Sequence, residues 1–304
     1  MNTKNKKSFS YAKYGYIFCI PFVLAYLVFS LYPTLYTIVL GFTDCKGLGN
    51  TNWHFLTEDI FRNYKVILTN ETFLLSLRNT VLLWVLNFIP QITLALLLTA
   101  WFTSRRNKIK GQGFFKVVFY MPNIITAATV AILFNVLFAY PKGPINDLLI
   151  SCGLRNEAFY FVNSPTASRL IIAFIQFWMW YGYTMIILIS GVLGINPEIF
   201  EAAEIDGASD SAIFWQITIP NLKPILIFTL IQALIGGLTM YDIPKMFNNG
   251  NPANSTLTAS VFIYNQAFAG SYMYNRAAAA SMIMFVIIAI CSVFVFLMMR
   301  DKKN

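Results

Sequence analysis

The sequence predicts an all-α integral membrane protein with six transmembrane helices. Of its 304 residues, 57% are hydrophobic and only 12% are charged, about half the charged fraction of an ordinary soluble domain. The mean hydropathy is +0.61. The apolar residues gather in six runs, each long enough to cross a bilayer, and polar segments separate them. These observations exclude a soluble globular fold.

The six spans follow one another with polar loops between them. Pro21 and Pro33 interrupt the first span and are interpreted as kinks that neighbouring helices support. Asn87, Gln91 and Asn123 lie within later spans, where we expect hydrogen bonds between helices rather than ligand binding. The expected spans are 16–42, 80–102, 117–139, 168–193, 225–244 and 277–299.

The domain organisation expected is one membrane domain over residues 16–299, between an N-tail at 1–15 and a C-tail at 300–304. The two tails with the loops at 103–116 and 196–224 hold 13 of the 22 lysines and arginines. By the positive-inside rule, both termini are expected in the cytoplasm. The 196–224 loop has one lysine and five acids, a tolerable departure because acids contribute little to topology.

Composition also excludes several kinds of chemistry. A single histidine leaves little room for histidine-based metal or triad sites, and the four cysteines show no metal-ligand spacing. Cys45 and Cys152 fall in loops expected outside, where they are either free thiols or a disulfide. No Gly-x-x-x-x-Gly-Lys-Ser/Thr phosphate loop is present, so we expect no ATP hydrolysis, no metal and no cofactor in this chain. The net charge of +9 reflects orientation rather than nucleic-acid binding, because the basic residues flank apolar spans.

The 196–224 loop is the most patterned polar stretch of the chain. Asn196 is predicted to cap a helix, and a proline and a glutamate follow it at the first helical positions. Gly207 is expected to end this short amphipathic helix. Ser209 is expected to cap a second short helix, which Pro220 ends. Two short helices joined by a glycine bend suit a partner's groove, although an ordinary amphipathic surface loop is the alternative.

Specific residues in this loop resemble a known family. Glu201-Ala202-Ala203, Gly207 four residues later and then Ile219-Pro220 resemble the EAA loop of ABC importer membrane subunits, with isoleucine at 219 where the family has leucine. Asp206-Gly207-Ala208 strengthens the match. In that family the loop docks in a cleft of a cytoplasmic ATPase. The resemblance therefore implies ATPase coupling by five residues: Glu201, Ala202, Ala203, Asp206 and Gly207.

Other segments look like carbohydrate-importer permeases of the maltose and multiple-sugar type. The opening span from Ile20 to Thr43 is similar to theirs, and Asn249-Gly250-Asn251-Pro252 looks like their Gly-Gly-Pro loop. The resemblance covers nearly the whole chain, which looks like the first of the two permeases. It implies a type I ABC importer transmembrane-domain fold, a second permease subunit in a heterodimer, two copies of an ATP-using partner ATPase, and an extracellular or periplasmic solute-binding protein. It also implies a bacterial plasma membrane location.

A sugar path requires hydrogen-bonding groups and aromatic faces. The fourth span offers Gln176, Trp180 and Tyr183, spaced to share one helical face. Where the maltose-type permease has asparagines, this chain has Gly237 and Met240. Gly236-Gly237 is a hinge, a close-packing site or room for substrate, and Asp242 either faces the path or pairs with Lys245. The path residues expected from the residues and the resemblance are Met179, Trp180, Tyr183, Gln232, Ala233, Gly236, Gly237, Met240 and Asp242.

Two other functions compete with the sugar importer. One is an ABC importer for another solute, such as glycerol phosphate, a polyamine or an amino acid. A phosphate cargo would favour arginines in mid-span, and the sequence has none there. The other is an intramembrane enzyme such as a lipid-linked glycosyltransferase using the acids of residues 198–210, which the missing Asp-x-Asp motif argues against.

Overall fold

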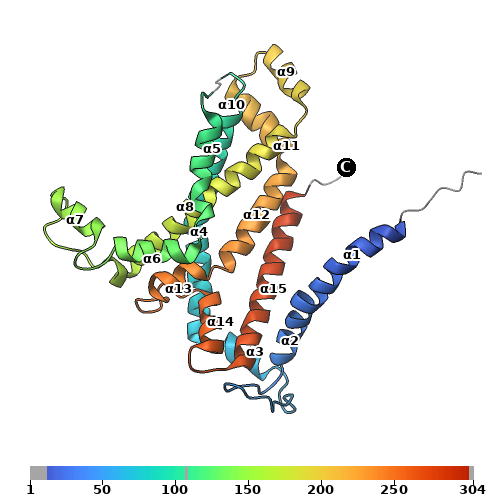
Figure 1. Ribbon diagram of the computed structural model, residues 1–304, viewed down its shortest axis with the longest axis vertical. Coiled ribbons are helices and arrows are strands. Elements are labelled where there is room, and N and C mark those ends of the chain that lie inside the picture. Colours follow the sequence, from blue (N-terminus) through green and yellow to red (C-terminus); the bar gives the residue numbers. More distant parts are fainter. Residues whose placement is uncertain (1–11, 107–108, 301–304) are drawn as a thin grey trace, which may run out of the picture.

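The computed structural model describes residues 12–106 and 109–300, and the chain is helical over most of both ranges (Figure 1). Within them, β pairing is limited to an isolated bridge between Thr43 and Phe55. The predicted tails at 1–15 and 300–304 lie mostly outside the described residues. The helices are α1 Ala12–Tyr26, α2 Tyr32–Leu40, α3 Arg62–Leu68, α4 Glu71–Thr103, α5 Gln112–Tyr120, α6 Ala127–Leu137, α7 Pro144–Ser151, α8 Pro165–Leu193, α9 Pro197–Ile205, α10 Asp210–Ala212, α11 Ile219–Asn221, α12 Lys223–Leu238, α13 Asp242–Asn248, α14 Ala259–Phe268 and α15 Tyr274–Met299.

The expected all-α fold with six apolar spans is present. Five helical segments are long and apolar enough to cross a membrane, and a bent helix pair supplies the sixth span. Several helices begin earlier than hydropathy indicates, because polar residues extend them beyond the apolar run. α4, for example, begins at Glu71 rather than at residue 80, since the side chain of Asn70 accepts a hydrogen bond from the backbone N–H of Phe73 and caps it.

The third span is not the continuous helix expected over 117–139. α5 and α6 meet at a bend of 87°, with a 3-10 turn at Met121–Ile124 between them. Pro122 in this turn lacks the N–H that an unbroken helix would need. The chain then becomes extended at Ile125, and Thr126 caps the new helix through its side chain. A proline followed by a capping threonine therefore ends one helix and starts another.

The fifth span is also divided, at residues 239–241, between α12 and α13. Pro244 gives the physical reason. Its ring would clash with the carbonyl of Met240 in a continuous helix, and it has no N–H to donate to that carbonyl. The Met240 carbonyl accepts a hydrogen bond from the Thr258 hydroxyl instead, at 2.8 Å. The expected span at 225–244 is therefore present as two consecutive helices, and the carbonyl freed at the break between them has a side-chain partner.

The core of the molecule lies between α4 and α8. Gln91 of α4 donates to the hydroxyl of Thr184 on α8 at 2.9 Å, and Asn123 donates to the carbonyl of Met179 at 3.2 Å. These are bonds between helices, as expected. The expectation was wrong for Asn87, whose side chain donates to the carbonyl of Leu83 in its own helix. Interhelical amide bonds of this kind each stabilise a membrane bundle by about 0.6 kcal/mol.

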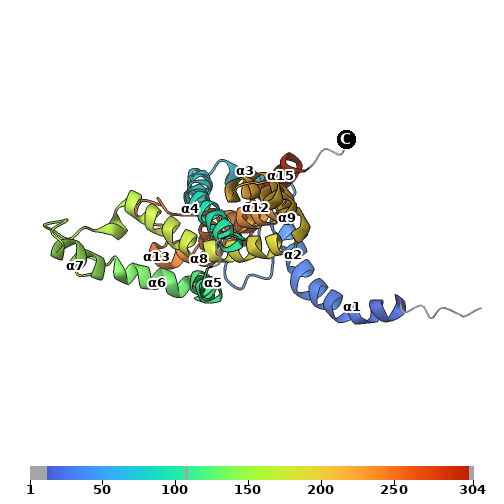
Figure 2. The same cartoon turned by 90° about the horizontal axis from the view of Figure 1, so that it is seen from above.

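Two parts of the chain project from this core on opposite sides. α1 extends away on one side, and α6 and α7 extend on the other, in both views (Figures 1 and 2). The apolar window of the first span, Lys13–Leu40, has no buried residue. α9 lies at one end of the molecule, while α3, α13 and α14 lie toward the other (Figure 1). The 196–224 loop is therefore remote from the loops that connect the other ends of the spans.

Candidate functional site

The 196–224 loop begins with the capped helix that its sequence predicts. The side chain of Asn196 accepts a hydrogen bond from the backbone N–H of Glu198 at 3.1 Å, and α9 runs from Pro197 to Ile205. Gly207 then adopts a φ of +80°, a backbone conformation in which a residue with a side chain is strained. Ser209 accepts from the N–H of Ala212 at 3.2 Å and starts the second helical segment.

The expected end of the second segment at Pro220 was wrong, because helix α11 continues through it to Asn221. A π-helical stretch at Ile213–Thr218 precedes the proline. Here the backbone N–H of Ile219 donates to the carbonyl of Phe214, five residues earlier. The Thr218 hydroxyl also donates to the carbonyl of Ile213 at 3.2 Å. The loop therefore consists of α9, a glycine bend and a longer, partly π-helical segment.

Acids of the 196–224 loop form ion pairs with the basic loop at 103–116. Arg105 pairs with Glu201 at 3.1 Å, and Arg106 pairs with Asp210 at 3.3 Å. Arg106 also donates to the carbonyl of Ala208 at 2.9 Å. The carboxylate of Glu201 is 58% exposed, so its pair is screened by water and contributes at most about 1 kcal/mol. Glu201 therefore remains available to another partner.

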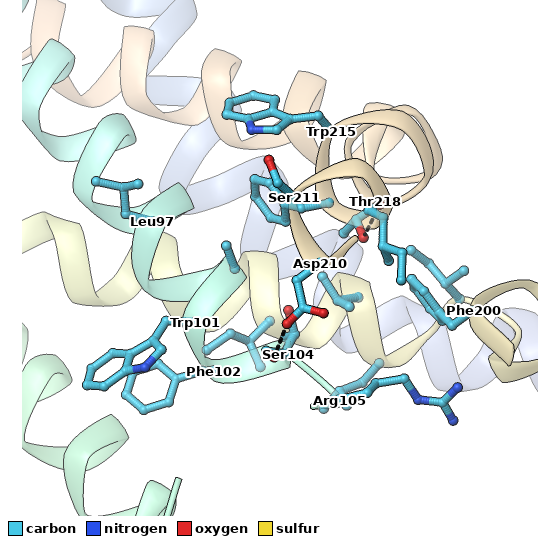
Figure 3. Close-up of a pocket in the computed structure, with 18 of the residues that line it drawn as sticks. Leu97, Trp101, Phe102, Ser104, Arg105, Phe200, Asp210, Ser211, Trp215 and Thr218 are labelled. Atoms are coloured by element: carbon cyan, nitrogen blue, oxygen red, sulfur yellow. Dashed lines mark hydrogen bonds between the residues drawn. The ribbon is translucent and has the colours of Figure 1, made fainter. Parts of the chain in front are cut away.

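An open cavity of about 640 Å³ lies between this loop and the ends of α4 and α5 (Figure 3). Ser104 bridges one side of it by donating to the carboxylate of Asp210 at 2.8 Å. On the other side, buried Phe200 packs with Val192 and Leu222, which joins α9 to the ends of α8 and α12. The loop is thus packed against the ends of α8 and α12, and polar contacts join it to the segment after α4 across the rim of an open cavity.

The path residues expected on α8 do not all face outward. Met179 is buried in the main core together with Met240, so neither side chain reaches solvent in this conformation. Gln176 is also buried. Trp180 is 38% exposed and contacts Tyr183 edge to face, with 5.6 Å between ring centroids. Trp180 and Tyr183 therefore form the aromatic surface that α8 offers.

The two glycines expected on α12 have different environments. A Cβ at Gly237 would collide with the indole of Trp84, whereas a Cβ at Gly236 would meet nothing within 4 Å. The indole N–H of Trp84 donates to the carbonyl of Ala233 at 3.2 Å. Gly237 is thus a close-packing site for α4, and Gly236 is exposed together with Gln232. Of the three roles that the sequence leaves open for this glycine pair, close packing therefore applies to Gly237, whereas Gly236 has open space beside it.

Asp242 does not form the alternative ion pair with Lys245. The ammonium of Lys245 donates to the side-chain oxygen of Asn265 at 2.8 Å and lies 4.7 Å from the ring centroid of Tyr264. Asp242 belongs to none of the ion pairs found between described residues, which include Lys65–Asp59, Arg105–Glu201 and Arg106–Asp210. Asp242 is exposed at the start of α13, at the break in the fifth span.

Sequence reasoning missed Trp84 and the arginines that face the 196–224 loop. Trp84 is one of several aromatic residues in an apolar run, and only the adjacent glycines on α12 hint at its contact. In the sequence, Arg105 and Arg106 only indicate which side of the membrane the 103–116 loop lies on. The excess of acids in the 196–224 loop was the available hint that these arginines have partners there. Cys45 and Cys152 are both free thiols, so the possible disulfide is not formed.

Comparison with known proteins places this arrangement in a family. Residues 75–301 match the family described as binding-protein-dependent transport system inner membrane component. The lactose transport system permease protein LacF of Rhizobium radiobacter is 31% identical over 291 residues, which cover 95% of each chain. The multiple sugar-binding transport system permease protein MsmF of Streptococcus mutans is 32% identical over 282 residues, covering 92% of this chain and 93% of the relative.

Solved structures show the same fold. A bacterial ABC transporter involved in the import of the acidic polysaccharide alginate superposes with a TM-score of 0.79 at 22% identity, covering 95% of this chain and 96% of that chain. A bacterial alginate ABC transporter in complex with a periplasmic protein carrying an alginate pentasaccharide gives 0.76 at 23% identity, covering 94% and 93%. The chain, with its six apolar spans and its capped 196–224 loop, therefore belongs to the binding-protein-dependent transport system inner membrane components, the permease subunits of ABC importers.

Proposed function

We propose that this permease subunit carries sugars, oligosaccharides in particular, in an ATP-driven importer, and that it couples to a cytoplasmic ATPase through the 196–224 loop. The observation that carries the coupling is the geometry of that loop. α9 is capped, Gly207 holds a left-handed bend, and Glu201 is half-exposed beside them. An exposed acid on a short, fixed helix at one end of a membrane bundle suits docking into a partner's groove.

The proposed assembly contains a second permease in a heterodimer, two copies of the ATPase and an external solute-binding protein. It lies in a bacterial plasma membrane with both termini of this chain in the cytoplasm. The partner ATPase binds and hydrolyses ATP, and this chain acts as a transport subunit without a cofactor and without enzymatic activity of its own. When the ATPases close, the 196–224 loop moves with them, and the spans attached to it tilt from an inward-open to an outward-open state.

Two features of the loop support this transmission. Phe200 packs with Val192 and Leu222, so a displacement of α9 is passed to the ends of α8 and α12. The 640 Å³ cavity, which Phe200 and Val192 also line, leaves unfilled space beside the loop, so the loop can shift with little displacement of packed side chains of α4 and α5. The helices that receive the motion are those that carry the proposed sugar path.

The sugar cargo is supported by the named relatives and by the chemistry of the path. The relatives include permeases for lactose, multiple sugars and arabinooligosaccharides. Trp180 and Tyr183 offer an aromatic surface to the C–H face of a sugar ring. Exposed Gln232 and the open space beside Gly236 on α12 offer an amide and room for a ring.

Uptake by variants of the loop tests the coupling. In cells that express the complete importer, Glu201→Ala and Gly207→Val should each reduce sugar uptake at least tenfold while leaving the amount of subunit in the membrane unchanged. Gln216→Ala, an exposed residue of the same loop outside the family pattern, is the matched control and should retain uptake.

A further variant separates docking from the internal ion pair. Arg105→Ala breaks the same pair as Glu201→Ala but leaves the carboxylate in place. We expect Arg105→Ala to retain most of the uptake. An equal loss in both variants would assign the effect to the ion pair within this chain, and normal uptake in Glu201→Ala and Gly207→Val would refute the coupling role.

Affinity purification of the tagged chain from gently solubilised native membranes tests the assembly. Mass spectrometry should find an ATPase and a second six-span permease, and the accompanying binding protein is then titrated with neutral sugars, an acidic sugar and glycerol phosphate. Binding of glycerol phosphate alone would replace the sugar cargo with that alternative. Recovery of the chain without an ATPase would contradict the importer assembly.

A further inference from the structure

A second cavity, of about 310 Å³, lies at the end of the molecule opposite the 196–224 loop. Its walls come from the N-terminus of α4, the 249–257 loop and α14. The polar residues that line it share one chemistry, because all carry a neutral amide or hydroxyl group. They are Asn70, Thr72, Asn249, Asn251, Asn254, Asn265 and Gln266. Two buried apolar residues, Leu257 and Phe262, complete the lining.

The 249–257 loop is held in one shape by buried partners. Asn79 of α4 is 1% exposed and donates both to the carbonyl of Asn254 at 2.7 Å and to that of Leu257 at 3.2 Å. The hydroxyl of Thr256 donates to the side-chain oxygen of Asn248 at 2.8 Å. The bonds from Asn79 use the backbone of the loop, and the bond from Thr256 joins two side chains that do not line the cavity. The cavity is therefore fixed in advance, which lowers the entropic cost of binding.

Most of the amides that line the cavity keep free hydrogen-bonding groups. Asn70 uses only its side-chain oxygen, to cap α4, and Asn265 uses only its oxygen, to accept from Lys245. Each retains an NH2 group with two donors. In the described part of the chain, the side chains of Asn249, Asn254 and Gln266 form no hydrogen bond. The cavity thus presents several free hydrogen-bond donors and several free acceptors close to one another.

The lining residues carry no charge, and this limits the ligand. An anionic or cationic ligand would lose its hydration without gaining an ion pair from the wall. The lining holds no arginine and its one aromatic residue is buried, so the cavity itself is better suited to a small ligand than to a protein side chain. A neutral ligand with many hydroxyl groups matches paired amide donors and acceptors.

We propose that this cavity binds one neutral sugar residue, at a site separate from the path between α8 and α12. The proposal rests on the proposed sugar cargo and adds a second place where the cargo is held. A ring over Leu257 and Phe262 would bond to amides from three elements that are distant in the sequence. The site would hold the sugar at the end of the permease remote from the 196–224 loop.

Two residues of the loop allow a sharp test. Asn249 and Asn254 have φ values of +52° and +55°, which glycine adopts without strain. The double variant Asn249→Gly/Asn254→Gly therefore removes two amide side chains and keeps the backbone shape. Ala253 has a φ of +48° in the same loop and does not line the cavity, so Ala253→Gly is a matched control for the added flexibility.

The measurement is saturation-transfer NMR on the purified full-length permease complex in nanodiscs, without the binding protein. The probes are lactose and arabinotriose as neutral sugars, and an alginate trisaccharide as an acidic one. We expect the neutral sugars to bind and the double variant to weaken their Kd at least fivefold, about 1 kcal/mol. Ala253→Gly should leave this binding unchanged.

Several outcomes would overturn the proposal. These are no binding of either neutral sugar, unchanged binding in the double variant, or an equal loss of binding in Ala253→Gly. Equal binding of the acidic trisaccharide would overturn the assignment to neutral sugars. Transport by the intact importer reports separately on the proposed function. A working sugar importer with no binding at this cavity would refute only the present inference.

Discussion

Replacing Gly237 with alanine should destabilise the packing of α12 against α4. The Cβ of the alanine would lie closer than 3.0 Å to the indole ring of Trp84. This ring is held by two further contacts, because it stacks on Phe88 with 5.3 Å between centroids and donates to the carbonyl of Ala233. The indole therefore cannot move aside without losing a contact, and the helices must separate instead.

The expected cost has two parts. Overpacking a close helix contact costs about 1–3 kcal/mol. A weakened bond from Trp84 to Ala233 adds about 0.6 kcal/mol, the average for interhelical hydrogen bonds in a membrane protein. The higher helix propensity of alanine, worth about 0.5–1 kcal/mol in water, offsets part of this. The net destabilisation expected is about 1–3 kcal/mol.

The assay is unfolding of the purified chain in mixed micelles by a denaturing detergent, followed by tryptophan fluorescence. Gly236→Ala is the matched control, since it makes the same substitution one residue earlier where nothing lies within 4 Å. It should not destabilise the chain, and the helix propensity of alanine should raise its stability by at most about 0.5–1 kcal/mol. Equal effects of the two variants, or wild-type stability of Gly237→Ala, would refute the packing role and favour a flexible glycine pair.

Two other predictions concern the loops and the buried amides. Burial, with a smaller contribution from Asp44, raises the pKa of the Cys45 thiol, so less of this thiol is thiolate at pH 7.5. A membrane-impermeant maleimide should therefore label exposed Cys152 far faster than Cys45, and the difference in rate should narrow as the pH rises toward the raised pKa. Equal labelling rates at pH 7.5 would contradict the burial of Cys45. Asn79→Leu should lower the free energy of unfolding in detergent by about 1–3 kcal/mol, because two carbonyls of the 249–257 loop lose their donor. Asn87→Leu should lower it by less, because the carbonyl of Leu83 keeps its helical partner. A larger loss in Asn87→Leu than in Asn79→Leu would refute this reasoning.

The positions of the spans could be predicted from hydropathy, but their breaks could not. Pro122 and Pro244 are both visible in the sequence, yet prolines are tolerated inside membrane helices when neighbours satisfy the freed carbonyls. Whether a helix merely bends or ends depends on those neighbours. Thr126 starts a new helix after Pro122, and Thr258, from a distant segment, binds the carbonyl that Pro244 frees. The second partner is a tertiary contact, which local pattern cannot indicate.

The same distinction applies to the candidate sites. The caps and the bend of the 196–224 loop are local, and the identities of Asn196, Gly207 and Ser209 determine them. The partner of Glu201 is Arg105, nearly a hundred residues earlier, and spacing along the chain contains no information about that contact. The amide-lined cavity combines three separate segments, so its asparagines look like ordinary loop residues in the sequence.

The length of α4 has a consequence for access to that cavity. Its 33 residues make a helix about 50 Å long, whereas the hydrocarbon core of a bilayer is about 30 Å thick. The apolar run begins only near Thr80, so residues 71–79 stand about 13 Å beyond it, in the headgroup region and the water. The part of α4 that extends beyond the apolar run therefore places the amide-lined cavity outside the hydrocarbon core of the bilayer. We therefore expect a solute in water to reach this cavity in both the inward-open and the outward-open state of the proposed importer.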